Sequence, residues 1–110
     1  MPNEDNSDRQ ALVTLGRDER IEVHAKAVDA SLVLTDRRLV VVTDQRLMVD
    51  VPIERVRRIE FDIEKGRPAT FVVVPEWPSD PPQSLAIPVE QYGAIAKLLT
   101  KVGSRLSTMG

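Results

Sequence analysis

Short aliphatic runs alternate with polar pairs through the first three quarters of the chain. Between residues 32 and 61 the runs are rich in Val, Leu and Ile, and turn-forming residues such as Asp36 and Asp44 separate them. Runs of this kind predict antiparallel strands that are joined by tight turns. We expect seven strands, at residues 20–28, 32–34, 39–42, 47–51, 58–64, 69–74 and 84–87.

The period of two within the strands predicts which side chains are buried. The residues expected to face inward are Ile21, Val23, Ala25 and Ala27 in the first strand, Leu47, Val49 and Val51 in the fourth, and Ile59, Phe61 and Ile63 in the fifth. Residues 39–42 are apolar throughout, which is typical of a strand that is buried on both faces. Residues 53–56 predict one helical turn that joins two sheets.

The period changes after Pro88, which suits the first turn of a helix. One helical stripe is expected to face the sheets: Val89, Tyr92, Ile95, Ala96, Leu99, Val102 and Leu106. Gly93 is expected to permit close packing on the sheet, and the helix is expected to fray after Gly103. The predicted fold is therefore mainly β, a seven-stranded antiparallel barrel or orthogonal sandwich that is capped by one amphipathic C-terminal helix.

Three segments resemble the sequence words of bacterial pleckstrin-homology (PH)-like domains. Residues 34–41, LTDRRLVV, resemble their "LT(D/N)-x-R-L" hairpin, and residues 51–60, VPIERVRRIE, resemble the segment that follows it. Residues 15–21, LGRDERI, are similar to a loosened form of the "GE-x-I" word before the first strand. The resemblance implies the PH fold and a role as an assembly or interaction module. Lipid-binding PH domains carry a run of Lys and Arg at the first hairpin loop, whereas residues 28–31 here are flanked by Lys26 alone.

Length and composition indicate one domain in the cytoplasm. We expect a flexible acidic arm at residues 1–10 and a PH-like domain at residues 11–106, with residues 11–15 forming either a helical turn or an edge segment. The chain has no cysteine, which excludes disulfides and thiolate chemistry. The net charge of −2 builds in no attraction to nucleic acid. The N-terminus has no apolar signal core, and no apolar run approaches the length of a membrane span.

Few residues offer chemistry for catalysis. His24 is the only histidine, and the strand pattern predicts that it faces solvent. Glu60, Asp62 and Glu64 share one strand face, which suits either a cation site or a solvated face whose carboxylates pair with arginines. Motifs for phosphate-binding loops, dinucleotide binding, serine hydrolases and zinc proteases are absent from the sequence. We therefore expect a protein that is not an enzyme and that needs no cofactor or metal.

Two sets of residues are candidates for binding. Trp77 and Pro78 lie in a proline-rich loop, and with Arg37 and Arg38 they form the candidate site for a protein partner or for a second copy of the chain in a homo-oligomer. The open alternative for Trp77 is that it folds back over one end of the barrel. The alternative function is binding to an anionic membrane surface through basic residues, namely Arg55, Arg57, Arg58, Lys97, Lys101 and Arg105.

Overall fold

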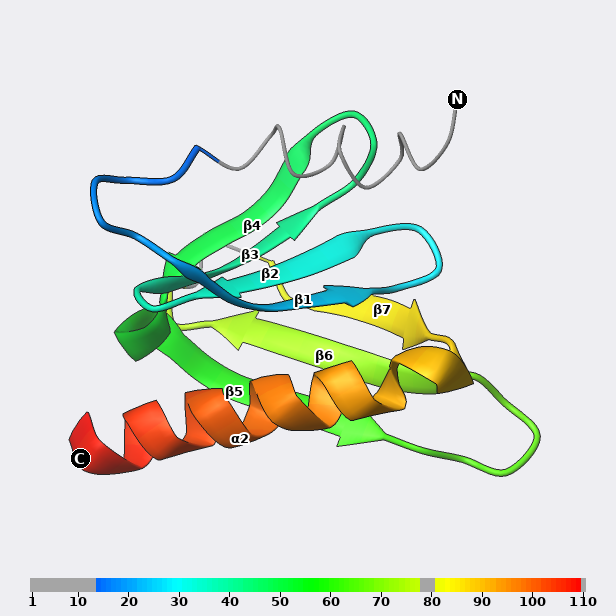
Figure 1. Cartoon of the computed structure of the whole chain (residues 1–110). Coiled ribbons are helices and arrows are strands. Elements are labelled where there is room, and N and C mark those ends of the chain that lie inside the picture. Colours follow the sequence, from blue (N-terminus) through cyan, green and yellow to red (C-terminus); the bar gives the residue numbers. More distant parts are fainter. Residues whose placement is uncertain (1–13, 78–80, 110) are drawn as a thin grey trace.

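Two antiparallel sheets and one C-terminal helix make up the computed structural model, which describes residues 14–77 and 81–109 (Figure 1). The predicted arm at residues 1–10, the start of the predicted domain at residue 11, and Pro78 lie outside the described residues. The elements are β1 (Ile21–Lys26), β2 (Ser31–Thr35), β3 (Arg38–Val42), β4 (Leu47–Pro52), η1 (Ile53–Arg55), β5 (Val56–Asp62), β6 (Ala69–Pro75), β7 (Gln83–Ile87), η2 (Val89–Gln91) and α2 (Tyr92–Met109).

The strands are connected in simple sequence order. The first sheet has the order β1-β2-β3-β4, and the second has the order β5-β6-β7. The single turn of η1 leads from one sheet to the other, which confirms the helical turn predicted there. At another corner the Val28 amide donates to the Ala86 carbonyl at 2.8 Å, which joins the end of β1 to β7. The predicted fold class is confirmed, and the two sheets form a sandwich rather than one closed barrel.

The main core lies between the sheets and α2. Phe71 from β6 is its largest fully buried side chain, and Leu32, Leu34 and Leu39 enter it from the first sheet. The helix contributes three fully buried residues, Ile95, Leu98 and Val102. Removing each large aliphatic side chain from water contributes roughly 1.5–3 kcal/mol, so the helix is held mainly by this stripe.

The central hairpin β2–β3 is buried on both of its faces. Val33, Val40 and Val42 alternate with the main-core residues of these strands and form a second buried cluster on the opposite face of the sheet. This confirms the prediction that residues 39–42 belong to a strand without a solvated face.

The predicted helical stripe is correct in most positions and wrong in two. Val89 lies in η2, before α2 begins, and is 70% exposed. Ala96 is exposed, and Leu98, which was not part of the predicted stripe, is fully buried. Residues 89–91 form a 3-10 turn and not the first turn of α2, so Val89 does not continue the apolar face of the α-helix.

The helix is longer than the sequence predicts, and Gly93 does not have the packing role that was predicted for it. It continues past Gly103 to Met109, so the predicted fraying at residue 103 is wrong. A Cβ at Gly93 would contact nothing within 4 Å, so the predicted close approach to the sheet is wrong as well.

The strands have shorter buried faces than the alternation predicts. Ile21 and Leu47 occupy the first positions of their strands and are exposed, and Ile63 lies beyond the end of β5 with 61% exposure. At a strand end the neighbouring elements no longer cover the inward face, so alternation continues in the sequence after burial has stopped. In the described part of the chain, no helix is long and apolar enough to cross a bilayer.

Candidate functional site

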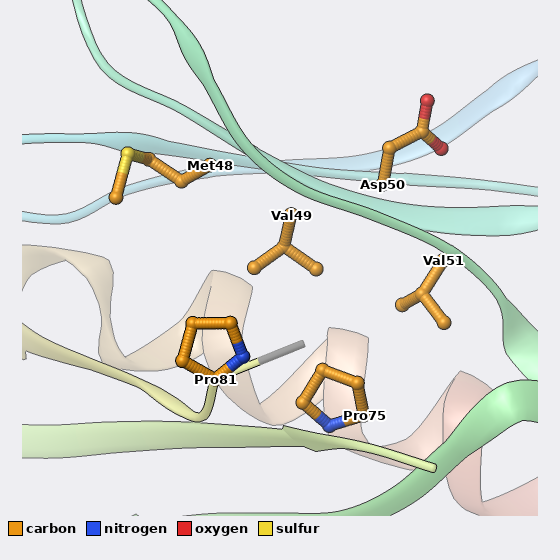
Figure 2. A pocket seen from close by; sticks show the side chains of 6 residues that line it. All are labelled: Met48, Val49, Asp50, Val51, Pro75 and Pro81. Atoms are coloured by element: carbon orange, nitrogen blue, oxygen red, sulfur yellow. The ribbon is translucent and has the colours of Figure 1, made fainter. Parts of the chain in front are cut away.

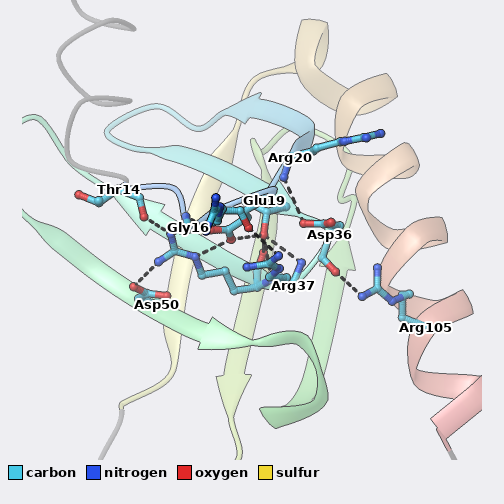
Figure 3. A network of polar contacts seen from close by, with 11 residues as sticks. Thr14, Gly16, Glu19, Arg20, Asp36, Arg37, Asp50 and Arg105 are labelled. Carbon is cyan, nitrogen blue, oxygen red and sulfur yellow. Dashed lines mark hydrogen bonds and ion pairs between the residues drawn. The ribbon is translucent and has the colours of Figure 1, made fainter.

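A buried ion pair joins the segment before β1 to the start of β3. The Glu19 side chain is 3% exposed, and its two carboxylate oxygens accept hydrogen bonds from Arg38 Nε at 2.8 Å and Nη2 at 3.1 Å. Thr35 Oγ1 donates to Glu19 Oε2 at 2.6 Å, and the Gly16 amide donates to Oε1 at 2.7 Å. Four donors therefore satisfy one buried carboxylate (Figure 3).

These donors lower the pKa of Glu19. The Arg38 hydrogen bond is the largest cause, and the pKa falls from 4.5 to about 2 although burial alone would raise it. The change corresponds to roughly 3 kcal/mol of stability that the ionised carboxylate contributes to the folded state.

Arg38 also reaches the outer strand of the sheet. Its Nη1 donates to Asp50 Oδ2 in β4 at 2.8 Å, and its Nη2 donates to the Thr14 carbonyl (Figure 3). The Arg38 side chain is 20% exposed, and its guanidinium contacts these acceptors and Glu19. Arg37 beside it donates from Nη2 to the Arg17 carbonyl at 2.8 Å. Both arginines of the candidate partner site thus contact the segment that precedes β1.

Trp77 is the second residue after β6 and is 54% exposed. The guanidinium carbon of Arg55 lies 5.6 Å from the indole ring centroid, and Arg55 Nη1 donates to Glu76 Oε1 at 2.8 Å. The Glu76 amide also donates to the Arg55 carbonyl at 2.8 Å. These contacts fix the backbone next to Trp77 and hold a cation against its ring. They also raise the pKa of Arg55, chiefly through the Glu76 hydrogen bond.

Two small pockets adjoin one another between β4 and the end of β6. The first has a volume of about 70 Å³, and Figure 2 shows Val49 and Val51 above Pro81 and Pro75 in it. The second, of about 40 Å³, shares Asp50, Val51 and Pro75 with the first and extends to Trp77. We call the lining of the second pocket the Trp77 surface, and it consists of seven residues: Asp50, Val51, Pro52, Arg55, Pro75, Glu76 and Trp77.

The structure brings together only part of the predicted partner site. Trp77 lies next to Pro52 and Asp50 at the β4 edge, and Arg38 reaches this region through Asp50. Arg37 borders a different, open hollow that Asp36, Glu54 and Arg105 also line.

The basic residues of the membrane alternative are distributed over three elements. Arg58 pairs with Glu60 at 3.0 Å, and Arg105 donates to the Asp36 carbonyl. Arg57 and Lys97 are exposed, whereas Lys101 is half-buried. Arg55 belongs to the Trp77 surface described above. Three of these six cations therefore contact acceptors of the protein itself.

The candidates for acid–base or metal chemistry do not assemble into a site. His24 is half-buried rather than fully solvated as predicted. Glu60 pairs with Arg58 within β5, and Glu64 lies 3.7 Å from Arg67 in the turn after it. The carboxylates thus pair with arginines, as one alternative predicted, but these pairs are local and do not cross between strands. Within residues 14–77 and 81–109, no group of three or more His, Asp or Glu side chains is arranged to hold a metal ion.

Sequence reasoning missed Glu19 and Asp50, the two carboxylates that fix Arg38. Glu19 lies 19 residues before Arg38 in the chain, and Asp50 lies 12 residues after it. The only local signal is an acidic residue directly before a strand and another within a strand, and neither pattern indicates a partner.

Comparisons with known proteins support the fold alone. No protein-family model and no curated protein matches the sequence. Among solved structures, the crystal structure of a pleckstrin homology domain from Shewanella amazonensis SB2B is similar, with a TM-score of 0.62 and 13% sequence identity. The similarity covers 84% of this chain and 87% of that chain, so it spans both sheets and the helix. The structural likeness therefore confirms the PH-like fold that the sequence words indicate.

Proposed function

We propose that this chain, which has a PH-like fold, is a non-enzymatic binding module that recognises a protein partner through the Trp77 surface. The observation that carries the proposal is the half-exposed indole, which the Arg55 guanidinium and the Glu76 backbone hold in place. A large aromatic side chain that is already ordered loses little conformational entropy on binding, and such residues dominate the energetics of protein interfaces.

The surroundings of Trp77 support a role in binding rather than in packing. Among the described residues β4 is the outermost strand of its sheet, and its residues 50–52 line one pocket together with Trp77. Apolar residues from β4 and β6 line the adjoining pockets together with the charged residues Asp50, Arg55 and Glu76. A mixture of apolar and polar groups around an aromatic residue is common in protein-binding surfaces.

Arg37 and Arg38 enter this proposal as supports rather than as contacts. Arg38 holds Asp50 at the border of the Trp77 surface, and Arg37 holds the backbone of the segment before β1. Since most donors of Arg38 already have acceptors, replacing it would disturb the binding surface through Asp50 and would also break the Glu19 pair.

The test compares Trp77→Ala with Ile63→Ala, a control that truncates a similarly exposed apolar residue. We expect both variants to keep the far-ultraviolet circular dichroism spectrum and a melting temperature close to that of the parent protein. Trp77→Ala should weaken partner capture or self-association by roughly 30-fold or more, which is the effect of losing an interface anchor. Quantitative pull-down and sedimentation equilibrium measure the two quantities, and equal behaviour of the variants would contradict the proposal.

Binding to an anionic membrane surface is the alternative function, and fewer observations support it. Arg55, Arg58 and Arg105 already contact acceptors of the protein, and Asp and Glu residues lie beside them. Co-sedimentation with vesicles of phosphatidylserine and phosphatidylcholine at low and high salt separates the alternatives. Salt-sensitive binding that is unchanged in Trp77→Ala would favour the membrane.

A further inference from the structure

We infer that the outer face of the first sheet is a docking surface for residues 1–13 of the same chain, and that Leu12 and Val13 supply the contact. The face is formed by Val33, Val40 and Val42, and we call it the valine face. The inference goes beyond the proposed function and does not involve the Trp77 surface. Three observations carry it, namely the burial of the valines, the place where the described chain starts, and the sequence of residues 11–13.

The three valines are fully covered, since each has an exposed fraction of 0%. Val33 pairs with Val40 across the hairpin, and His24 and Asp50 occupy the neighbouring positions in β1 and β4. Neighbours within one sheet shield a side chain only from the sides, because side chains stand roughly perpendicular to the sheet. A second layer of atoms is therefore needed to cover the valine face.

The described elements do not supply this layer. The second sheet and α2 lie on the opposite side of the first sheet, where Leu32, Leu34 and Leu39 enter the main core (Figure 1). In the described part of the chain, the valine cluster includes no residue of a third element. Residues 78–80 connect β6 to β7 and residue 110 follows α2, so both are attached to elements on that opposite side. Residues 1–13 are the remaining candidate within the chain.

The described chain starts beside the valine face. Because side chains alternate along a strand, Arg38 lies on the same face of β3 as Val40 and Val42. Its Nη2 donates to the carbonyl of Thr14, the first described residue (Figure 3). A strand advances by about 3.3 Å per residue, so the distance from Arg38 to Val42 is about 13 Å, which four extended residues span. The residues directly before Thr14 can therefore reach the whole face.

The sequence before Thr14 fits an apolar surface. Ala11, Leu12 and Val13 are consecutive apolar residues, whereas residues 3–10 are all polar. The attachment at Thr14 keeps residues 11–13 close to the face, so their docking is intramolecular. A second copy of the chain or a separate partner would lose translational and rotational freedom on binding there. The tethered segment is therefore the favoured occupant.

Thiol labelling of the full chain tests the inference. The chain has no cysteine, so a single introduced cysteine reports solvent access at its own position. Val40→Cys places the probe on the valine face, and Val41→Cys places a control probe on the inner face of the same strand, in the main core. We expect Ellman's reagent to react slowly at both positions in the otherwise unchanged protein.

Leu12→Asp combined with Val13→Asp should release residues 1–13 from the valine face. We expect labelling at position 40 to become about tenfold faster or more while labelling at position 41 stays slow, because only the outer face opens. The matched control is Leu15→Asp, which adds a charge at a residue that is 41% exposed and should leave both rates unchanged. If the double variant unfolds, both positions react fast, and the milder Leu12→Ala decides. It should raise the rate at position 40 alone.

Four results would overturn the inference. They are fast labelling at position 40 in the otherwise unchanged protein, equal rates at position 40 in the double variant and in Leu15→Asp, no effect of Leu12→Ala at position 40, and a rate at position 40 that rises on dilution while sedimentation equilibrium detects a dimer. The last result would assign the valine face to a second copy of the chain. Since Trp77 is unchanged in all of these variants, none of the four results bears on the proposed function.

Discussion

Among the polar contacts of the described residues, the Glu19–Arg38 pair is the one that we expect to contribute most to stability. Four hydrogen-bond donors point at the buried Glu19 carboxylate. If the carboxylate is neutralised, these donors lose the negative charge that they bind. Removing one partner of a buried ion pair is costly because the other charge remains buried.

We therefore expect Glu19→Gln to lower the free energy of unfolding by about 2–4 kcal/mol. Glu90→Gln, at an exposed position, should change it by less than about 0.5 kcal/mol. Urea unfolding followed by circular dichroism measures both. A loss for Glu19→Gln as small as that of the control would show that solvent reaches the pair.

The same carboxylate predicts a pH dependence of stability. Its pKa is lowered from 4.5 to about 2 in the folded protein. The unfolded chain therefore takes up the proton first as the pH falls, so this contribution is present above about pH 4.5 and is lost between about 4.5 and 2. The parent protein and Glu19→Gln should differ in stability by a constant amount from pH 5 to 7, and the difference should shrink below pH 4.5. Urea midpoints across this range measure it, and a constant difference down to pH 2.5 would contradict the assignment.

At the scale of elements, the helix shows how a correct period can be assigned the wrong face. The predicted stripe included Leu99 but not Leu98, whereas Leu98 is fully buried and Leu99 is half-buried. Two adjacent leucines with the same chemistry therefore make different contributions, and they form a matched pair for mutation.

We expect Leu98→Ala to lower the free energy of unfolding by about 2–5 kcal/mol, since it leaves a cavity in the main core. Leu99→Ala should cost clearly less, because solvent already reaches this side chain and fills the space. Chemical unfolding of both variants gives the comparison. Equal losses would mean that the helix is rotated relative to the sheets by part of a turn.

At the same scale, the strands were predicted more reliably than their ends. The turn residues around Asp36 and Asp44 and the proline at position 52 are local signals, so the order of the strands could be predicted from the sequence. The exposure of Ile21 and Ile63 depends on how far the neighbouring elements extend, and this is not encoded in the strand itself.

At the scale of the whole molecule, the fold was largely predictable and the binding surface only partly so. Seven short strands and an amphipathic helix have few ways to bury their apolar faces, which is why the pattern leads to the sandwich and its helix. The Trp77 surface instead depends on contacts between residues that are distant in the chain. Arg55 and Glu76 are 21 residues apart, and Arg38 and Asp50 are 12 apart, so nothing local indicates that they meet.

The valines on the reverse side of β2 and β3 have a consequence for how the molecule tolerates change. Both faces of this hairpin are buried, one by Leu32, Leu34 and Leu39 and the other by Val33, Val40 and Val42. We therefore expect the hairpin to be the last part of the chain to unfold. The corner formed by β4, η1 and Trp77 is not part of this hairpin. Natural variation can therefore remodel the corner for new ligands while the hairpin keeps the architecture intact.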